Sequence, residues 1–306
     1  MDIVKWLLEG DISIRYQVHR DLLKSESSIL GNLKSRIYNE GFAKELLALQ
    51  KEDGHWGDGF YQPKWTCTHY TLLELRYLEL NKTDSTTKIL DKIVSECINF
   101  DGGITPTKTK FGSDVCINGM FLNYACYFGI EENRIESIID YIIEQQLPDG
   151  GFNCNFNRSG ARHSSLHSTL SVLEGIEEYI LNGYTYQIDK LKKMKSEAIE
   201  FILIHRLYKS DHTGEIIQKA MTYITYPPRW KYDILKALDY FNHADIPYDS
   251  RMEDSINLLK KKMDKEGIWP NQGKHKGAVH FEMEPNSKKS RFNTLRVLRV
   301  LMRYDD

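Results

Sequence analysis

Residues 147–176 read LPDGGFNCNFNRSGARHSSLHSTLSVLEGI, a glycine-containing polar loop that is followed by an apolar segment. The same order recurs in KEDGHWGDGFYQPKWTCTHYTLLELRYLEL (51–80) and FDGGITPTKTKFGSDVCINGMFLNYACYFG (100–129), and again over 205–241 and 265–301. In this alignment the five apolar segments begin at Thr71, Met120, Thr169, Ile234 and Thr294. Repetition at a period of tens of residues is typical of an array of similar structural units.

Amphipathic segments lie between these copies. They are NRIESIIDYIIEQQL (133–147), LKKMKSEAIEFILIHRL (191–207) and RMEDSINLLKKKM (251–263), with apolar residues at i, i+3, i+4 and i+7. Each unit therefore holds an amphipathic helix, a polar loop and a more apolar helix, which together make an αα-hairpin. Repeated hairpins form either an open solenoid or a closed ring.

The contrast between the apolar and the amphipathic helices favours closure, with the apolar helices inside. We therefore predict an all-α fold, an α/α toroid (barrel) of about six helical hairpins with inner and outer helix layers. No linker or low-complexity tract interrupts the chain, so residues 1–306 are predicted to form a single domain. Residues 1–47 supply at least two further helices, which would close or cap the ring.

The composition excludes several classes of protein. The 306 residues are 41% hydrophobic and 27% charged with a net charge of −2, which gives no reason to expect a nucleic acid as partner. No segment approaches the ~18 uncharged apolar residues of a membrane span, and the N-terminus does not have the form of a signal peptide. Five cysteines, an odd number spread along a long chain, favour a reducing compartment. We expect a cytoplasmic protein without a membrane span.

In a closed ring, the N-terminal ends of the inner helices surround one mouth of a central cavity and carry partial positive charge. Two columns of the repeat alignment fall at this mouth. One column holds His69, Asn118, His167, Tyr232 and Phe292, and the other holds Cys67, Cys116, Ser165, Trp230 and Ser290. Polar and aromatic side chains at such positions are typical of a lined cavity rather than a packed core.

The tips KEDGHWGD (51–58), LPDGGFNC (147–154) and KEGIWP (265–270) resemble the glycine–aromatic turns of the terpenoid cyclase and protein prenyltransferase superfamily, whose members fold as α/α toroids. SDVCINGMFLNYACYFG (113–129), followed by GGFNCN and HSSLHSTLSVLEGI, is more particularly similar to the β subunits of protein prenyltransferases. The resemblance covers roughly residues 45–180, and the rest of the chain shares only the shape of the repeats.

The resemblance implies a zinc ion held by Asp114, Cys116 and His167. In such a site the open fourth position takes the thiol of the acceptor, which the metal holds as thiolate. Cys154 lies in the loop before His167 and could be a fourth ligand, or a ligand in place of Asp114. The alternative without a metal is an Asp114 at a helix N-cap, two packed thiols and a hydrogen-bonded His167.

Several features depart from the prenyltransferase pattern. Ile117 stands where that family has an aromatic residue, and only Lys108 and Lys110, in a shifted register, precede the aspartate as diphosphate ligands. The enzymes of the family work with a separate helical subunit, so a partner subunit is compatible with the resemblance. The Asp-x-Asp-Asp proton donor of squalene–hopene cyclases and the Asp-rich motifs of ionising terpene synthases are both absent, which argues against cyclisation.

Basic and aromatic residues near the mouth are the candidates for substrate binding. A diphosphate is bound by Lys and Arg side chains together with helix N-termini, and tryptophan or tyrosine rings suit an isoprenoid tail. Arg229 and Arg291 are favoured because each lies in the turn before an inner helix. His163, four residues before His167, could share the metal, but an anion contact or a simple hydrogen bond is favoured for it. The predicted substrate contacts are Lys108, Lys110, Trp65, His69, His163, Arg229, Trp230, Tyr232 and Arg291.

Three functions follow from these patterns. The first is a prenyltransferase-like or squalene-cyclase-like protein with a central cavity, which uses zinc to transfer an isoprenoid from a diphosphate to a thiol or small nucleophile. The second is a non-catalytic toroid that binds a lipid or a protein and holds a structural zinc. The third is a sugar-active α/α-barrel lyase or hydrolase, which needs two carboxylates that face each other across the cavity. The expected ligand of the first function is an isoprenoid or another apolar molecule.

Overall fold

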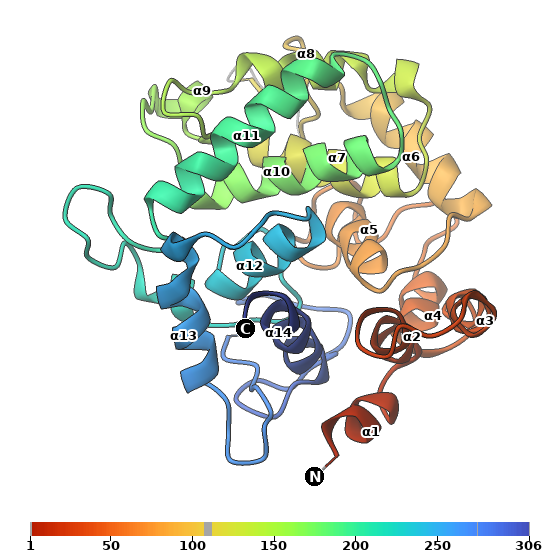
Figure 1. Cartoon of the computed structure of the whole chain (residues 1–306). Helices are drawn as coiled ribbons and strands as arrows, with labels where there is room; N and C mark the ends of the chain where they lie inside the picture. The colour runs from red at the N-terminus through yellow and green to blue at the C-terminus, as the bar shows by residue number, and fades with distance from the viewer. Residues whose placement is uncertain (1, 107–111, 274, 306) are drawn as a thin grey trace.

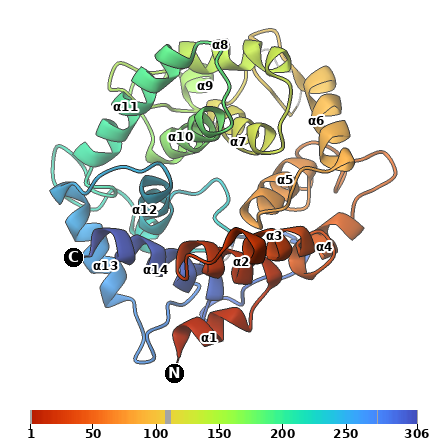
Figure 2. The same ribbon diagram turned by 45° about the vertical axis from the view of Figure 1, so that its right-hand side comes forward.

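The computed structural model describes residues 2–106, 112–273 and 275–305, and these form a ring of helices in two layers (Figure 1, Figure 2). The inner helices are α2 (Ile12–Asp21), α5 (Thr68–Tyr77), α7 (Val115–Tyr127), α10 (Leu166–Leu181), α12 (Ile234–His243) and α14 (Arg291–Tyr304). The outer helices are α1 (Ile3–Leu8), α3 (Ser27–Arg36), α4 (Gly41–Ala48), α6 (Asp84–Cys97), α8 (Glu136–Glu144), α11 (Ile188–Ile204) and α13 (Glu253–Lys261). Short elements in the connections are η1 (Glu132–Arg134), α9 (Phe156–Ser159), η2 (Lys219–Thr222) and η3 (Ser250–Met252).

The ring is closed because α14, the last inner helix, packs against α2, the first (Figure 2). The described residues contain no β-strand. The prediction of an all-α toroid with an inner and an outer layer is therefore confirmed. None of the helices in the described part of the chain combines the length and the apolar character that a bilayer crossing needs.

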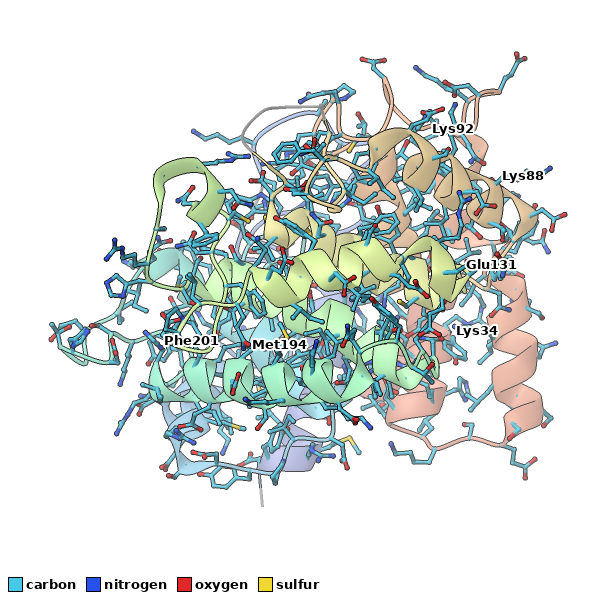
Figure 3. The ribbon with its side chains drawn as sticks, turned by 90° about the horizontal axis from the view of Figure 1, so that it is seen from above. Lys34, Lys88, Lys92, Glu131, Met194 and Phe201 are labelled. Atoms are coloured by element: carbon cyan, nitrogen blue, oxygen red, sulfur yellow. The ribbon has the colours of Figure 1, made fainter. Side chains whose placement is uncertain are left out.

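The two layers differ in burial as the sequence pattern predicts. In α7, every residue is buried except Cys116 and Tyr127, because this helix packs against neighbours on all sides. The outer helix α6 buries only one face, which includes Ile89 and Ile93, and Lys88 projects from its other face into solvent (Figure 3). A helix that is apolar all round is buried, whereas a surface helix carries a single apolar stripe.

A recurrent hydrogen bond fixes each glycine–aromatic turn to the start of an inner helix. The hydroxyl groups of Thr68, Thr169 and Thr294 accept bonds of 3.0–3.1 Å from the backbone N–H groups of Trp56, Phe152 and Trp269. In the second repeat the Asn118 side chain takes this role and accepts from the Ile104 N–H at 2.6 Å. The structurally equivalent residues are thus Thr68, Asn118, Thr169 and Thr294. The sequence alignment is therefore correct at Thr169 and Thr294, but in the first two repeats it is shifted by a few residues, to Thr71 and Met120.

Residues 226–230 (YPPRW) cross the centre of the ring. The Asn271 side chain bonds both the N–H and the carbonyl oxygen of Tyr226, whose ring stacks on Phe292 at 3.9 Å. Arg229 donates from Nε to Glu74 on α5 at 2.9 Å, and both side chains are buried. The segment therefore fills space that would otherwise belong to one deep central cavity.

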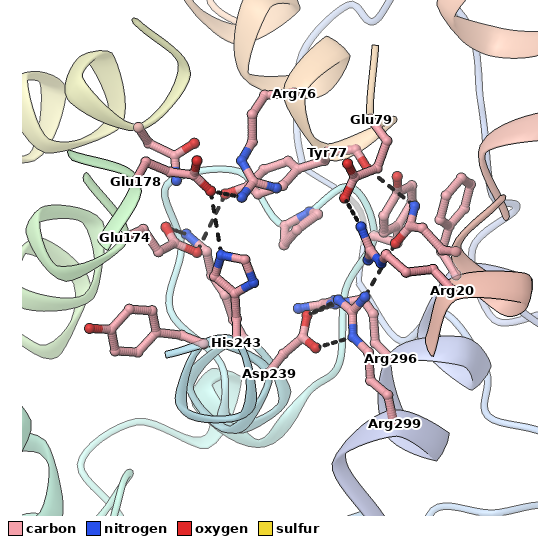
Figure 4. Close-up of a pocket in the computed structure, with 17 residues that line it drawn as sticks. Arg20, Arg76, Tyr77, Glu79, Glu174, Glu178, Asp239, His243, Arg296 and Arg299 are labelled. Atoms are coloured by element: carbon pink, nitrogen blue, oxygen red, sulfur yellow. Dashed lines mark hydrogen bonds and ion pairs between the residues drawn. The ribbon is translucent and has the colours of Figure 1, made fainter. Parts of the chain in front are cut away.

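Beside this segment, the centre of the ring is lined by paired charges (Figure 4). Asp239 accepts from Arg296 and Arg299, Arg76 is paired with Glu178, and a cavity of about 80 Å³ remains between these side chains. This end of the ring is consequently polar rather than apolar.

Candidate functional site

A half-open cavity of about 890 Å³ lies at the N-terminal ends of α7 and α10. Asp114, Cys116, Cys154 and His167, the four predicted metal ligands, all contribute to its walls. Further wall residues are Tyr61, Lys64, Ile117, Arg158, Ser168 and Trp230. We call this space the thiol cavity. The side chains come from two successive hairpins because the ring places the starts of neighbouring inner helices side by side.

The two cysteines of the thiol cavity are in contact. Cys116 lies in the first turn of α7, and its backbone N–H donates to Cys154 Sγ at 3.2 Å. The Cys116 thiol also donates to Cys154, which raises the pKa of Cys116 and lowers the pKa of Cys154. A third donor, the Ser168 hydroxyl, lies 3.4 Å from Cys154 Sγ. Donors directed at a sulfur atom stabilise its thiolate form.

Asp114 occupies the N-cap position of α7, but its side chain makes no capping bond. It is instead paired with Arg158, whose side chain is exposed. Burial raises the pKa of Asp114, and the Arg158 guanidinium acts in the opposite direction. The carboxylate therefore already has a cationic partner in this arrangement.

His167 is held by protein groups. Its Nδ1 accepts a hydrogen bond of 2.7 Å from the Tyr232 N–H, so the proton of the neutral ring lies on Nε2. Burial lowers the pKa of His167 to about 4, although a hydrogen bond with the Gln218 side chain acts against this shift. The Trp230 ring lies 5.3 Å from the imidazole.

The side chains as they lie do not fit a three-ligand zinc site. Zinc takes a lone pair from its histidine ligand, but His167 Nδ1 is engaged with Tyr232 and Nε2 carries the proton. Asp114 is paired with Arg158. Among residues 2–106, 112–273 and 275–305, no three His, Cys, Asp or Glu side chains lie close enough to share a metal ion. Zinc binding thus stays a prediction of the sequence resemblance.

Arg229 and Arg291, which the sequence favours as anion ligands, do not lie at the thiol cavity. Arg229 is buried against Glu74, and Arg291 donates to the Trp6 carbonyl oxygen with its guanidinium 4.6 Å above the Trp6 ring. Neither residue lines the cavity, because each is bound to a residue distant in the sequence, Glu74 or Trp6. Lys108 and Lys110 lie outside the described residues.

Lys64 and Arg158 supply positive charge to the thiol cavity instead. Lys64 Nζ lies 4.9 Å from the Trp65 ring and 5.0 Å from the Trp230 ring. Partial burial lowers the pKa of Lys64. An anion bound beside Lys64 would offset this loss of hydration.

Of the remaining predicted substrate contacts, some line the thiol cavity and others are buried in the protein core or exposed on the surface. Trp230 lines the thiol cavity, and Tyr232 supports His167 through its backbone. Trp65 is buried and donates to the Lys276 carbonyl oxygen at 2.5 Å, and His69 is fully buried with Nδ1 3.1 Å from the Tyr124 hydroxyl. Burial lowers the pKa of His69 to about 3. The His163 side chain is exposed to solvent and is not part of the cavity wall.

Comparisons with known proteins assign no family to the chain. No protein-family description and no curated protein sequence matches the chain. A protein from Actinoplanes of solved structure is 13% identical, with 97% of this chain and 91% of that chain covered and a TM-score of 0.49. The type II terpene cyclase MstE from Scytonema is 12% identical, with 88% and 97% covered and a TM-score of 0.34.

A variant of MstE in complex with geranylgeranyl dihydroxybenzoate is 11% identical, with 88% of this chain and 96% of that chain covered and a TM-score of 0.31. Identities and TM-scores this low say nothing about the ligand of the present chain. The assignment of a helical ring rests on the structure itself.

Lys64 and Arg158 were missed by sequence reasoning, and for Lys64 a signal exists. Lys64 precedes Thr68 by four residues, as Asp114 precedes Asn118 and Ser165 precedes Thr169. All three column members line the thiol cavity, so the corrected alignment places Lys64 there. Arg158 lies in the loop that contains α9, outside the aligned columns, and no repeat signal points to it.

Proposed function

We propose that the thiol cavity binds an isoprenoid diphosphate and that the protein transfers the isoprenoid group to a thiol or small nucleophile. The observation that carries this proposal is the single cavity in which two thiols, two cations and apolar side chains meet. Tyr61, Ile117 and Trp230 offer an apolar wall, whereas Lys64 and Arg158 offer charge. Apolar pockets with a few well-placed polar groups are typical of small-molecule sites.

Within this proposal, the chain's own groups hold the leaving diphosphate. Lys64 and Arg158 would pair with its oxygens, and Arg158 would exchange its present partner Asp114 for the diphosphate, since its side chain is exposed. The N-termini of α7 and α10 point toward the same space and favour an anion there. In the transfer, the bond from the allylic carbon to the diphosphate oxygen breaks, a carbon–sulfur bond forms to the acceptor, and the thiol proton is lost.

Replacing Lys64 with alanine tests the diphosphate part of this proposal. We expect the variant to bind geranyl or farnesyl diphosphate roughly 10- to 100-fold more weakly in calorimetric titration, because a charge-assisted hydrogen bond contributes roughly 1.5–3 kcal/mol. Lys88→Ala, on the outer face of α6, is the matched control and should bind as the wild type does. Equal affinities of K64A and wild type, or no binding by either, would contradict the assignment.

Metal analysis tests the zinc prediction. Because His167 and Asp114 already have protein partners, we expect protein that has been exposed to zinc and dialysed to retain well below one zinc per chain. Stoichiometric zinc that is lost in both Cys116→Ala and His167→Ala would instead establish the metal site that the resemblance implies. We derive no step of the transfer from a metal.

A second candidate is a non-catalytic binding toroid. It is favoured by residues 226–230, which cross the ring and are fixed there by Asn271 and Glu74, so that they occupy space a long chain would need. Incubation with farnesyl diphosphate and a small thiol separates the two candidates. Thioether formation with release of diphosphate supports the transferase, whereas binding without turnover supports the binding toroid.

Two carboxylates of the polar central cavity, Glu178 and Asp239, give no support to a sugar hydrolase. Such an enzyme needs one carboxyl group that is protonated near neutral pH. Burial alone would raise the pKa of Glu178 and Asp239, but Arg76 holds the pKa of Glu178 below its usual range, and Arg299 and Arg296 hold that of Asp239 at about 2 (Figure 4). Both groups are therefore ionised, and neither can act as the general acid.

A further inference from the structure

Two cysteines from different repeats lie in contact, since the backbone N–H of Cys116 is 3.2 Å from Cys154 Sγ and both residues line the thiol cavity. Cys116 lies in the first turn of α7, and Cys154 lies in the loop before α10. The loop holds Cys154 in place through its backbone N–H, which donates to the Ser168 hydroxyl at 3.2 Å, while the Cys116 N–H donates to Cys154 Sγ. A sulfur atom that lies 3.2 Å from the backbone nitrogen of the other cysteine is close to that residue's own side chain, which is the arrangement that a disulfide of about 2.05 Å needs.

Small molecules in solvent can reach Cys116 and Cys154, but not two of the other cysteines. Cys67 and Cys126 are fully buried, whereas Cys116 and Cys154 are partly exposed and both line the thiol cavity. A cavity of about 890 Å³ admits a peroxide or a small disulfide. Cys97, on the outer helix α6, does not line this cavity.

We propose that Cys116 and Cys154 form a reversible oxidation site, at which a peroxide or a low-molecular-weight disulfide converts the two thiols into an intramolecular disulfide. With hydrogen peroxide, one thiol attacks the O–O bond, becomes a sulfenic acid and releases water. The second thiol then displaces the oxygen from that sulfur as a second water, and the S–S bond forms. Two electrons pass from the sulfurs to the peroxide, and a dithiol reductant reverses the change.

The disulfide would tie the loop that holds Cys154 to the first turn of α7. It would also remove both thiols from the wall of the cavity, so the oxidised protein could not use them toward a ligand or a metal. Oxidation itself does not depend on the proposed transferase activity, and only this consequence for the cavity rests on the proposed function.

Counting of thiols in the full-length protein tests the proposal. The reduced chain has five cysteines and should take up five maleimide labels after denaturation. After treatment of the folded protein with hydrogen peroxide we expect a loss of two labels, a peptide that links residues 116 and 154, and full recovery with dithiothreitol. Cys97→Ser is the matched control and should also lose two labels, whereas Cys116→Ser and Cys154→Ser should form no intramolecular disulfide.

Retention of all five labels under peroxide that oxidises a small free thiol would overturn the proposal, as would a disulfide that involves another cysteine. Circular dichroism of both serine variants checks that each remains folded, and the wild-type linkage map stands even where one variant does not fold. Isoprenoid binding by the reduced protein is measured separately, so failure of the oxidation and failure of the proposed function give different results.

Discussion

Replacing Gly175 with alanine is expected to destabilise the protein by about 3 kcal/mol, although the same change in most helices is stabilising. Gly175 lies inside α10 where this helix meets α7. A Cβ atom at residue 175 would overlap the backbone carbonyl oxygen of Gly119 on α7, and backbone cannot move aside as a flexible side chain can. The two inner helices would have to separate. Urea denaturation followed by circular dichroism measures the change.

Gly31→Ala supplies the matched control for this variant. Gly31 also lies inside a helix, α3, but a Cβ atom there would meet nothing within 4 Å. Alanine at residue 31 should therefore stabilise the protein by about 0.5–1 kcal/mol, the usual difference in helix propensity. A G175A variant that is as stable as the wild type, alongside a stabilised G31A, would show that α7 and α10 are not packed as closely as described.

Arg229→Ala should have an effect of similar or larger size, about 3–5 kcal/mol, because it leaves the Glu74 carboxylate buried without its cation. Both side chains are almost inaccessible, and Arg229 Nε lies 2.9 Å from Glu74 Oε1. Arg206→Ala is the control, since Arg206 pairs with Asp254 at 3.6 Å on the surface. Exposed pairs of this kind contribute no more than about 1 kcal/mol. Chemical denaturation of the two variants compares the pairs directly.

The destabilisation of Arg229→Ala should also depend on pH. Burial already raises the pKa of Glu74 above its usual value of 4.5, and the loss of Arg229 removes the charge that opposes this shift. The folded variant then holds a proton that the unfolded chain releases near pH 4.5, so its stability falls as the pH rises. We expect a larger deficit at pH 8 than at pH 5. A double variant, Glu74→Met with Arg229→Met, should recover most of the lost stability, and a deficit independent of pH would contradict this account.

The fold could be predicted because apolar periodicity and turn motifs are local properties of the chain. The register of the repeats was predicted less well, since the loops that precede Thr68 and Asn118 differ in length from the loop that precedes Thr169. The register of each repeat depends on which side chain accepts the hydrogen bond from the backbone N–H of the turn, and both threonine and asparagine side chains accept this bond. This substitution hides the equivalence of Asn118 and Thr169 from sequence comparison.

The thiol cavity was predicted in part for a related reason. Asp114, Cys116, Cys154 and His167 meet because successive hairpins pack side by side and bring the starts of α7 and α10 together, which the repeat order implies. The roles of Arg229 and Arg291 could not be predicted in the same way. Whether such a residue faces a cavity or a partner depends on Glu74 and Trp6, which lie far away in the sequence. The hydrogen bond from Tyr232 to His167 is likewise a tertiary contact.

The contact between α14 and α2 has a consequence for how the protein is made. Arg299 near the C-terminus donates to Gln17 and Asp21 on α2, so the first inner helix lacks these partners until the last one has left the ribosome. The early hairpins are therefore synthesised before α2 has these partners, and the ring closes only after α14 has been made.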